Sequence, residues 1–172
     1  MTFHDTHLPH YQFREYHTIT VRAKPERIYP MIRSFDFSGS KLIKILFMLR
    51  GLPAVMVRME GVQKEKFVLL QEQMNTEIII GLIGQFWKPD GNLKVFSPAE
   101  FATIDEPGHA KATWNFRLVP QADTTVVETE TRIHCTDSEA LRKFSRYWFL
   151  IRPFSGLIRR EMLKAIKKSA ER

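Results

Sequence analysis

The hydrophobic pattern predicts a strand and two helices in the first third of the chain. Residues 14–23 alternate β-branched and polar positions, which is typical of a strand. Over residues 23–35 the apolar side chains recur at helical spacing after Pro25, a residue that suits the first turn of a helix. Pro30 removes a backbone hydrogen bond inside this helix, so we expect it to be short or bent. Residues 38–51 carry a further apolar stripe and predict a second helix.

Strand patterns dominate the middle of the chain. The predicted strands are residues 66–73, 76–87, 92–96, 101–105, 111–119 and 124–135. A two-residue connection at Met74 and Asn75 would join the first two. Pro98 interrupts the strand pattern between the third and the fourth predicted strands. The order predicts a run of antiparallel strands.

The last two predicted strands form the clearest hairpin, and their register follows if Val119 lies opposite Thr124. One face is then polar and largely charged; it includes Glu128, Glu130 and Arg132, and we interpret it as a solvated ladder, although the same face turned inward would form a carboxylate site. The other face is mostly apolar and contains Ala112, Trp114, Phe116, Leu118, Thr125, Val127, Thr129 and Thr131. This pattern is typical of a sheet with one wet face.

Residues 137–170 predict a long C-terminal helix with Asp137 as its N-cap. At about 1.5 Å per residue the helix would be roughly 50 Å long, which exceeds a domain of this size. Pro153 and Gly156 therefore predict a kink between residues 150 and 157. The apolar stripe is broader than a surface helix needs, so a large part of it requires cover.

The surplus positive charge lies in this last helix. The chain has a formal net charge of +7; residues 142–172 contain ten Lys or Arg and two Glu, whereas residues 1–141 contain sixteen basic and seventeen acidic residues. A nearly neutral body does not present the broad basic face that nonspecific nucleic-acid binding uses, so nucleic acid is disfavoured as a partner. A membrane surface stays open as a partner of the basic helix.

Composition favours one folded domain over residues 1–172, with residues 1–13 as a loosely ordered N-terminus. A chain of 172 residues with 44% hydrophobic residues can bury a sizeable core. The single Cys135 excludes an intrachain disulfide and fits a reducing compartment. The N-terminus lacks a signal-peptide pattern, and the apolar runs are shorter than the roughly 18 residues that span a bilayer. We expect a cytoplasmic protein that is at most peripheral at a membrane.

Simple catalytic or metal-binding patterns are missing. His4, His7 and His10 are spaced by threes, but no carboxylate or thiol cluster completes a metal site, so no metal is expected. His134 and Cys135 are neighbours on a predicted strand and point to opposite faces, so they cannot act together as base and nucleophile. No Gly-rich phosphate loop with its Lys is present, and no cofactor is expected.

The order of elements resembles the START-like, or helix-grip, superfamily (SRPBCC), which includes polyketide cyclases and lipid-transfer domains. The resemblance is carried by "TITVRAKPERIYPMI", "EIIIGLIGQFW" and "VVETETRIHCTDSEALRKFSRYW". It implies an α+β fold in which a curved antiparallel sheet wraps around the long C-terminal helix and encloses an elongated apolar cavity. The ligand-binding candidates in that cavity are Trp114, Phe116, Thr129, Thr131, Trp148 and Ile151. The residues by themselves leave a solid core equally open.

Three hypotheses about function remain, because fold analogy alone does not choose among activities. The first is binding or transport of a hydrophobic small molecule or lipid. The second is an enzyme of cyclase or dehydratase type, in which a Thr, His or Glu inside the cavity positions a polyketide-like substrate. The third is a peripheral membrane or protein-interaction module that uses the basic C-terminal helix. The sequence does not specify an oligomeric state.

Overall fold

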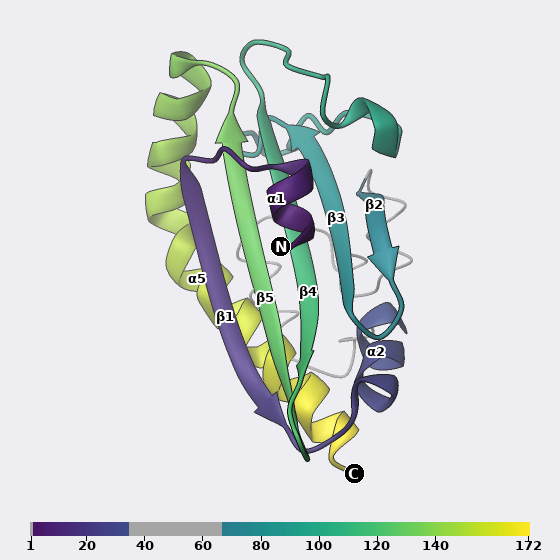
Figure 1. Cartoon of the computed structure of the whole chain (residues 1–172). Helices are drawn as coiled ribbons and strands as arrows, with labels where there is room; N and C mark the ends of the chain where they lie inside the picture. The colour runs from purple at the N-terminus through teal and green to yellow at the C-terminus, as the bar shows by residue number, and fades with distance from the viewer. Residues whose placement is uncertain (1, 35–66) are drawn as a thin grey trace.

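A five-stranded antiparallel sheet with one long helix across it forms the body of the described chain (Figure 1). This computed structural model describes residues 2–34 and 67–172. The helices and strands are α1 (Phe3–His7), β1 (Phe13–Val21), α2 (Pro25–Ser34), β2 (Val68–Gln73), β3 (Glu77–Gly84), the 3-10 helix η2 (Pro98–Glu100), β4 (Ala110–Pro120), β5 (Thr125–Cys135) and α5 (Ser138–Ala170). The strand order is β1-β5-β4-β3-β2, so the first strand of the chain pairs with the last.

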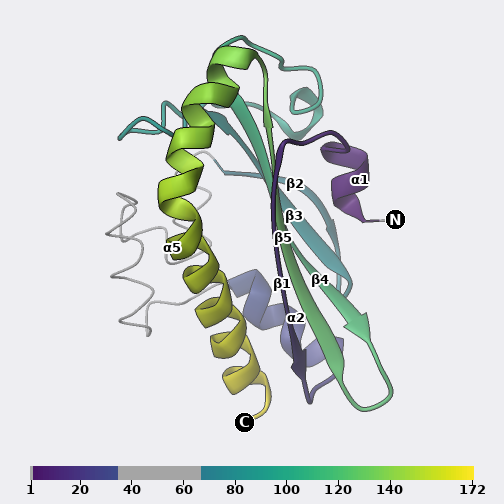
Figure 2. The same cartoon turned by 90° about the vertical axis from the view of Figure 1, so that its left-hand side faces the viewer.

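The two faces of the sheet are covered by different helices. Figure 2 shows α5 along one face and the short α1 on the other. We call the face under α5 the inner face; it carries Trp114, which lies beneath the guanidinium of Arg159 from α5. We call the face under α1 the outer face; it carries Thr113, which contacts His4. The α+β helix-grip fold predicted from the sequence, with its curved sheet and long C-terminal helix, is confirmed.

Strand β3 is buried on both faces, which explains its continuous apolar run. Its inner side chains Ile78 and Ile80 join the core under α5. Its outer side chains Ile79 and Ile83 pack in a separate cluster with Leu8, Leu70, Phe96 and Phe101. The outer face is therefore dry at this end of the sheet, and the prediction of one wet face does not hold here.

The β4–β5 hairpin differs from its predicted register by two residues. Val119 lies opposite Val126 rather than Thr124. The four-residue connection is 121–124 instead of 120–123, closed by a hydrogen bond from Gln121 N to Thr124 O (2.7 Å), so the hairpin slides by one residue on each strand. Because side chains alternate with period two, a shift of two leaves each one on its predicted face.

Two local predictions for the middle of the chain are wrong. The segments 92–96 and 101–105 are not strands; the chain between β3 and β4 consists of turns, irregular segments and η2, and its contact with β3 includes the bond from Lys94 N to Ile83 O (2.9 Å). The β2–β3 connection has three residues, since Gln73 pairs with Glu77 and Asn75 adopts a positive φ of 59°. The predicted helix over residues 38–51 lies outside the described residues.

Helix α5 continues through Pro153 without a break and curves gently around the sheet (Figure 2). The bend predicted between residues 150 and 157 thus takes the form of this gentle curve. Pro153 cannot donate a hydrogen bond to the carbonyl of Phe149 four residues earlier. Both residues are exposed, so water can satisfy that carbonyl. Helices commonly curve around a core with their solvent side convex, and this curvature accommodates the proline.

The N-terminus is predicted to be loosely ordered over residues 1–13, but α1 and Leu8 pack on the outer face of the sheet. Helix α1 buries the imidazole of His4 completely, and Leu8 after it is also buried. Gln12 extends the contact, because its backbone N donates to Ile133 O (2.9 Å) next to the start of β1. The segment therefore covers polar groups of the sheet that would otherwise face water.

Asp137 caps α5 as predicted, and its removal should destabilise the fold. Its carboxylate accepts from Ala140 N (2.7 Å) and from Gly108 N in the loop before β4. Substitution Asp137→Ala should lower the free energy of unfolding by about 1–2 kcal/mol, because both amides lose their acceptor. Asp137→Asn keeps a capping oxygen and should cost less. Urea denaturation followed by tryptophan fluorescence compares the two; equal losses would contradict the capping role.

Candidate functional site

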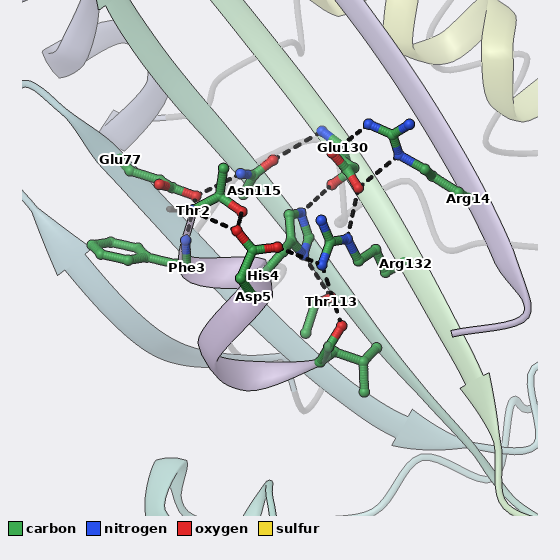
Figure 3. A network of polar contacts seen from close by, with 11 residues as sticks. Thr2, Phe3, His4, Asp5, Arg14, Glu77, Thr113, Asn115, Glu130 and Arg132 are labelled. Atoms are coloured by element: carbon green, nitrogen blue, oxygen red, sulfur yellow. Dashed lines mark hydrogen bonds and ion pairs between the residues drawn. The ribbon is translucent and has the colours of Figure 1, made fainter. Parts of the chain in front are cut away.

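The outer face holds a network of charged side chains beneath α1, with the buried Glu130 and Arg132 at its centre (Figure 3). Glu130 lies at its centre and accepts two hydrogen bonds from Arg14, at 2.8 Å from Nε and 3.0 Å from Nη2. Arg132 donates from Nε to the same carboxylate (2.7 Å) and from Nη1 to Asp5 of α1 (3.0 Å). A buried carboxylate with several charge-assisted bonds is well compensated for its loss of water. The network therefore ties α1 to β1 and β5.

Asn115 and Glu77 extend this network to β3. The Asn115 side chain donates to Glu77 (2.6 Å) and accepts from the backbone N of Glu130 (2.9 Å). Glu77 also accepts from the backbone N of Phe3 in α1 (3.2 Å). Burial raises the pKa of Glu77, and the bonds from Asn115 and Phe3 oppose that effect.

The contacts of His4 determine its tautomer. Its Nε2 lies 3.1 Å from the carbonyl oxygen of Glu130, which can only accept, so Nε2 carries the proton. Its Nδ1 lies 2.8 Å from Oγ1 of Thr113 and accepts from that hydroxyl in the neutral ring. Burial lowers the pKa of His4 to about 4; the Arg132 charge lowers it further, while Glu130 opposes the shift.

The outer network has a structural role, because it holds α1 against the sheet. The prediction that Glu128, Glu130 and Arg132 form a solvated ladder is wrong for the last two, which are buried under α1. Of the three, only Glu128, which accepts from Tyr16 (2.9 Å), stays partly exposed. The carboxylate of Glu130 is already occupied by two arginines, so it has little capacity left for a ligand.

The inner face contains a different polar feature, between two apolar clusters. Toward the C-terminal end of α5, one cluster joins Phe116, Leu118 and Val127 of the sheet to helix residues such as Met162. Toward its N-terminal end, the other gathers around Phe144 and Trp148. The side chains between them include polar and charged groups; we call Glu15, His17, Thr129, Thr131 and Arg159 the polar belt. The interior under α5 is thus apolar at both ends and polar in the middle.

Four residues of the polar belt come from the sheet, and they form two neighbouring cross-strand pairs on the inner face of β1 and β5. Glu15 pairs with Thr131, and His17 pairs with Thr129, across the β1–β5 ladder. The His17 ring nitrogen Nε2 lies 3.0 Å from Oε1 of Glu15, so the two side chains form one unit. Glu15 is only 9% exposed, and its Oε2 has no hydrogen-bond partner within residues 2–34 and 67–172. A buried carboxylate oxygen without a partner is costly in a folded protein.

Helix α5 supplies the cationic member of the belt and a close approach to it. Arg159 is 9% exposed, lies 3.7 Å above the centre of the Trp114 ring and donates to Oγ1 of Thr131 (2.9 Å). Gly156 passes directly over Glu15: a Cβ there would lie 3.2 Å from Oε1 of Glu15 and 3.7 Å from Nε2 of His17. Glycine at this position lets the helix backbone approach the carboxylate.

The structure brings four of the six predicted ligand-binding residues into this region. Trp114 and Phe116 lie side by side on the inner face with ring centroids 5.2 Å apart. Thr131 belongs to the belt through Arg159. The Thr129 hydroxyl accepts from Trp114 Nε1 (2.8 Å) and donates to Asn115 O (2.7 Å), so it already makes two bonds within the sheet.

The other two predicted residues, Trp148 and Ile151, lie away from the belt in the cluster around Phe144. Trp148 stacks on Phe144 with centroids 5.8 Å apart, and Phe13 of β1 approaches the same rings. Ile151 is partly buried against that cluster. A role in ligand binding for these two residues stays a prediction, as it does for the other four.

Sequence reasoning missed the charged members of the belt, although the alternation contained a signal for them. Glu15 and His17 share the period-two face of β1 with Ile19 and Val21, which the apolar pattern places inside. Arg159 lies four residues before the buried Leu163, on the same side of the helix. Charged residues in a strongly apolar face are unusual enough to mark a site.

Within residues 2–34 and 67–172, no group of three or more His, Cys, Asp or Glu side chains is arranged to hold a metal ion. None of the helices described in these ranges combines the length and the apolar character needed to cross a bilayer.

Comparisons with known proteins give distant structural similarity only. No protein-family model matches the chain, and no curated protein sequence matches it. The crystal structure of TTHA0849 from Thermus thermophilus aligns over 92% of this chain and 97% of that one, with 8% identity and a TM-score of 0.37. The di-domain ARO/CYC protein BexL from the BE-7585A biosynthetic pathway aligns over 93% of this chain and 47% of that one, with 14% identity and a TM-score of 0.36. The fold therefore rests on the sheet order and helix packing above.

Because His4 is buried and neutral, we expect the folded protein to lose stability as the pH decreases. Between pH 6.5 and about pH 4 the unfolded chain binds a proton at His4 that the folded chain does not, so the free energy of unfolding decreases as the pH falls through this window. The loss approaches about 3 kcal/mol at its acid end. Urea denaturation at about pH 7, 5.5 and 4.5 measures it.

Two variants isolate this effect. His4→Gln should flatten the pH dependence, while the matched substitution of the exposed His10→Gln should leave it unchanged. Glu77 acts in the opposite direction, because its raised pKa favours the folded state on acidification, but it contributes equally to all three proteins. Identical pH slopes for the wild type and His4→Gln would refute the assignment.

Proposed function

We propose that this protein binds an apolar small molecule or lipid bearing a hydroxyl group, between the sheet and α5. The observation that carries the proposal is the polar belt, above all the buried Glu15 whose Oε2 has no hydrogen-bond partner among the described residues. Buried polar groups in native proteins are nearly always satisfied, and an exception needs an explanation. A hydroxyl on a bound ligand would supply the missing donor.

The surroundings of Glu15 support the same ligand chemistry. Binding sites for small molecules are mostly apolar, with a few polar groups that set orientation. Here the apolar clusters of Trp114 and Phe144 lie on either side of the belt and would contact the apolar body of the ligand. Glu15 would accept from its hydroxyl, and Arg159 beside Thr131 would balance the charge of the carboxylate.

Glu15→Gln should weaken binding of a hydroxylated probe. Isothermal titration with β-naphthol and β-methylnaphthalene compares two aromatic probes that differ by a hydroxyl and a methyl group. The wild type should prefer β-naphthol by about tenfold to a hundredfold, because a hydrogen bond to an ionised group contributes about 1.5–3 kcal/mol. Glu15→Gln should lose most of this preference, and the outer-face control Glu128→Gln should keep it.

Direct extraction tests the occupant itself. Mass spectrometry of an organic extract should find a hydroxylated apolar molecule with the purified wild type. Gly156→Leu should lose this molecule, because a side chain there would push against Glu15 and His17. An empty extract, together with no preference between the two probes, would contradict the proposal.

The contact between Glu15 and His17 favours acid–base catalysis as a second candidate. A carboxylate 3.0 Å from an imidazole can orient and polarise the ring for proton transfer. The simplest matching reaction removes the α-proton and the hydroxyl of a β-hydroxyacyl thioester as water. Incubation with a β-hydroxyacyl N-acetylcysteamine thioester should give the conjugated enoyl thioester, and His17→Gln should reduce the rate at least about a hundredfold. Absence of product, or an unchanged rate in the variant, would leave binding without catalysis.

A further inference from the structure

The side of α5 that faces away from the sheet carries an apolar surface with basic ends. Phe149, Leu150, Phe154 and Leu157 are 82%, 67%, 40% and 45% exposed. At about 100° per residue these four lie within roughly 140° of the helix circumference, and Arg146 and Arg160 fall in the same arc. We call the four apolar residues with Arg142, Arg146, Arg160 and Lys164 the outer stripe; the basic members lie before and after the apolar centre.

The charge of the outer stripe is largely uncompensated. The ion pairs of α5 use Lys143 with Glu139, Lys164 with Glu161, and Lys167 with Glu171. Within the described part of the chain, Arg142, Arg146 and Arg160 form no ion pair. These arginines are exposed and project on either side of large apolar side chains.

We propose that the outer stripe docks the protein on an anionic membrane surface, with α5 lying parallel to the bilayer. Helices that lie in a membrane interface combine large apolar side chains at the centre of one face with basic residues around them. The apolar centre would enter the boundary between headgroups and acyl chains, and the arginines would contact anionic headgroups. The proposed association is peripheral, because α5 would lie in the plane of the interface.

Charge argues against the two other occupants of this surface. A second copy of the chain would bring an equally basic stripe, and like charges repel at close range. Residues 38–51 are apolar enough to cover the stripe, but their sequence contains Lys41, Lys44 and Arg50 and no acidic residue. An anionic lipid surface satisfies both the apolar centre and the basic ends.

The proposal is independent of the ligand site, although the two share a helix. Leu157 of the stripe is adjacent in sequence to Gly156, and Arg159 of the polar belt follows within one turn. The same segment would therefore face lipid on one side and the belt on the other. A docked protein would hold its inner site one helix diameter, about 10 Å, from the membrane surface.

Vesicle co-sedimentation of the full chain tests the proposal. Vesicles of pure phosphatidylcholine are compared with vesicles that contain about 30% phosphatidylserine, at about 0.05 M and about 0.5 M salt. The wild type should bind the anionic vesicles and lose most binding at high salt. Arg146→Glu with Arg160→Glu should lower the partition coefficient at least about 25-fold, since each basic residue contributes roughly fivefold. Phe149→Ser with Leu150→Ser should lower it at least about tenfold.

Matched controls separate the stripe from general properties of the chain. Arg22→Glu with Arg27→Glu makes the same change of net charge elsewhere, and Met74→Ser with Val95→Ser removes two other exposed apolar side chains. Both should bind nearly as the wild type does, and circular dichroism should show all four variants folded. Equal binding to neutral and anionic vesicles, no binding, or equal losses in controls and stripe variants would overturn the proposal. A dimer in gel filtration that Phe149→Ser with Leu150→Ser dissociates would also overturn it. A thermal midpoint lower in that variant than in the wild type would do the same if neither protein binds vesicles.

Discussion

Strands β4 and β5 are covered on both faces, and this double cover is the constraint on which the rest of the structure depends. Where α5 and α1 cover this strand pair, Thr113, Asn115, Glu130 and Arg132 are buried, so each polar side chain there needs a partner inside the protein. On the outer face the requirement is met by Arg14, Asp5 and His4, which complete the bonds of Glu130, Arg132 and Thr113. The short N-terminal helix is thus needed to satisfy charges that lie more than a hundred residues away along the chain.

The inner face meets the same constraint less completely. Thr129 and Trp114 satisfy each other, and Arg159 bonds Thr131, but Glu15 keeps an oxygen without a partner among the described residues. Replacing buried charges by apolar residues is often neutral or stabilising, so charges here are not explained by stability alone. The closed outer network and the open inner belt are built from the same residue types. They differ in whether a group among the described residues fills the last hydrogen-bonding position, and this difference is the basis of the binding proposal.

Helix α5 takes part in both the polar belt and the outer stripe, because its two sides carry different residues. Its inner side supplies apolar residues to two clusters and lets Gly156 approach Glu15. Its outer side exposes phenylalanine, leucine and arginine. Pro153 lies on the exposed side, where the missing hydrogen bond costs least, and the helix stays continuous. A single long helix can carry both surfaces because residues three and four apart share a side while residues two apart do not.

The sequence by itself determined the features that depend on local periodicity. Alternation identified β1, β4 and β5, and it placed Trp114 and Phe116 on the inner face although the predicted register was two residues away. The Asp137 cap located the start of α5. These features could be predicted because strand period two and helix period 3.6 are properties of neighbouring residues. Only the tertiary structure decided that α1 covers the outer face, that Glu130 and Arg132 are buried, and that Glu15, His17 and Arg159 meet under α5. Those outcomes depend on contacts between residues far apart in the chain, and the burial of a charge depends on what covers it, which periodicity within one segment does not specify.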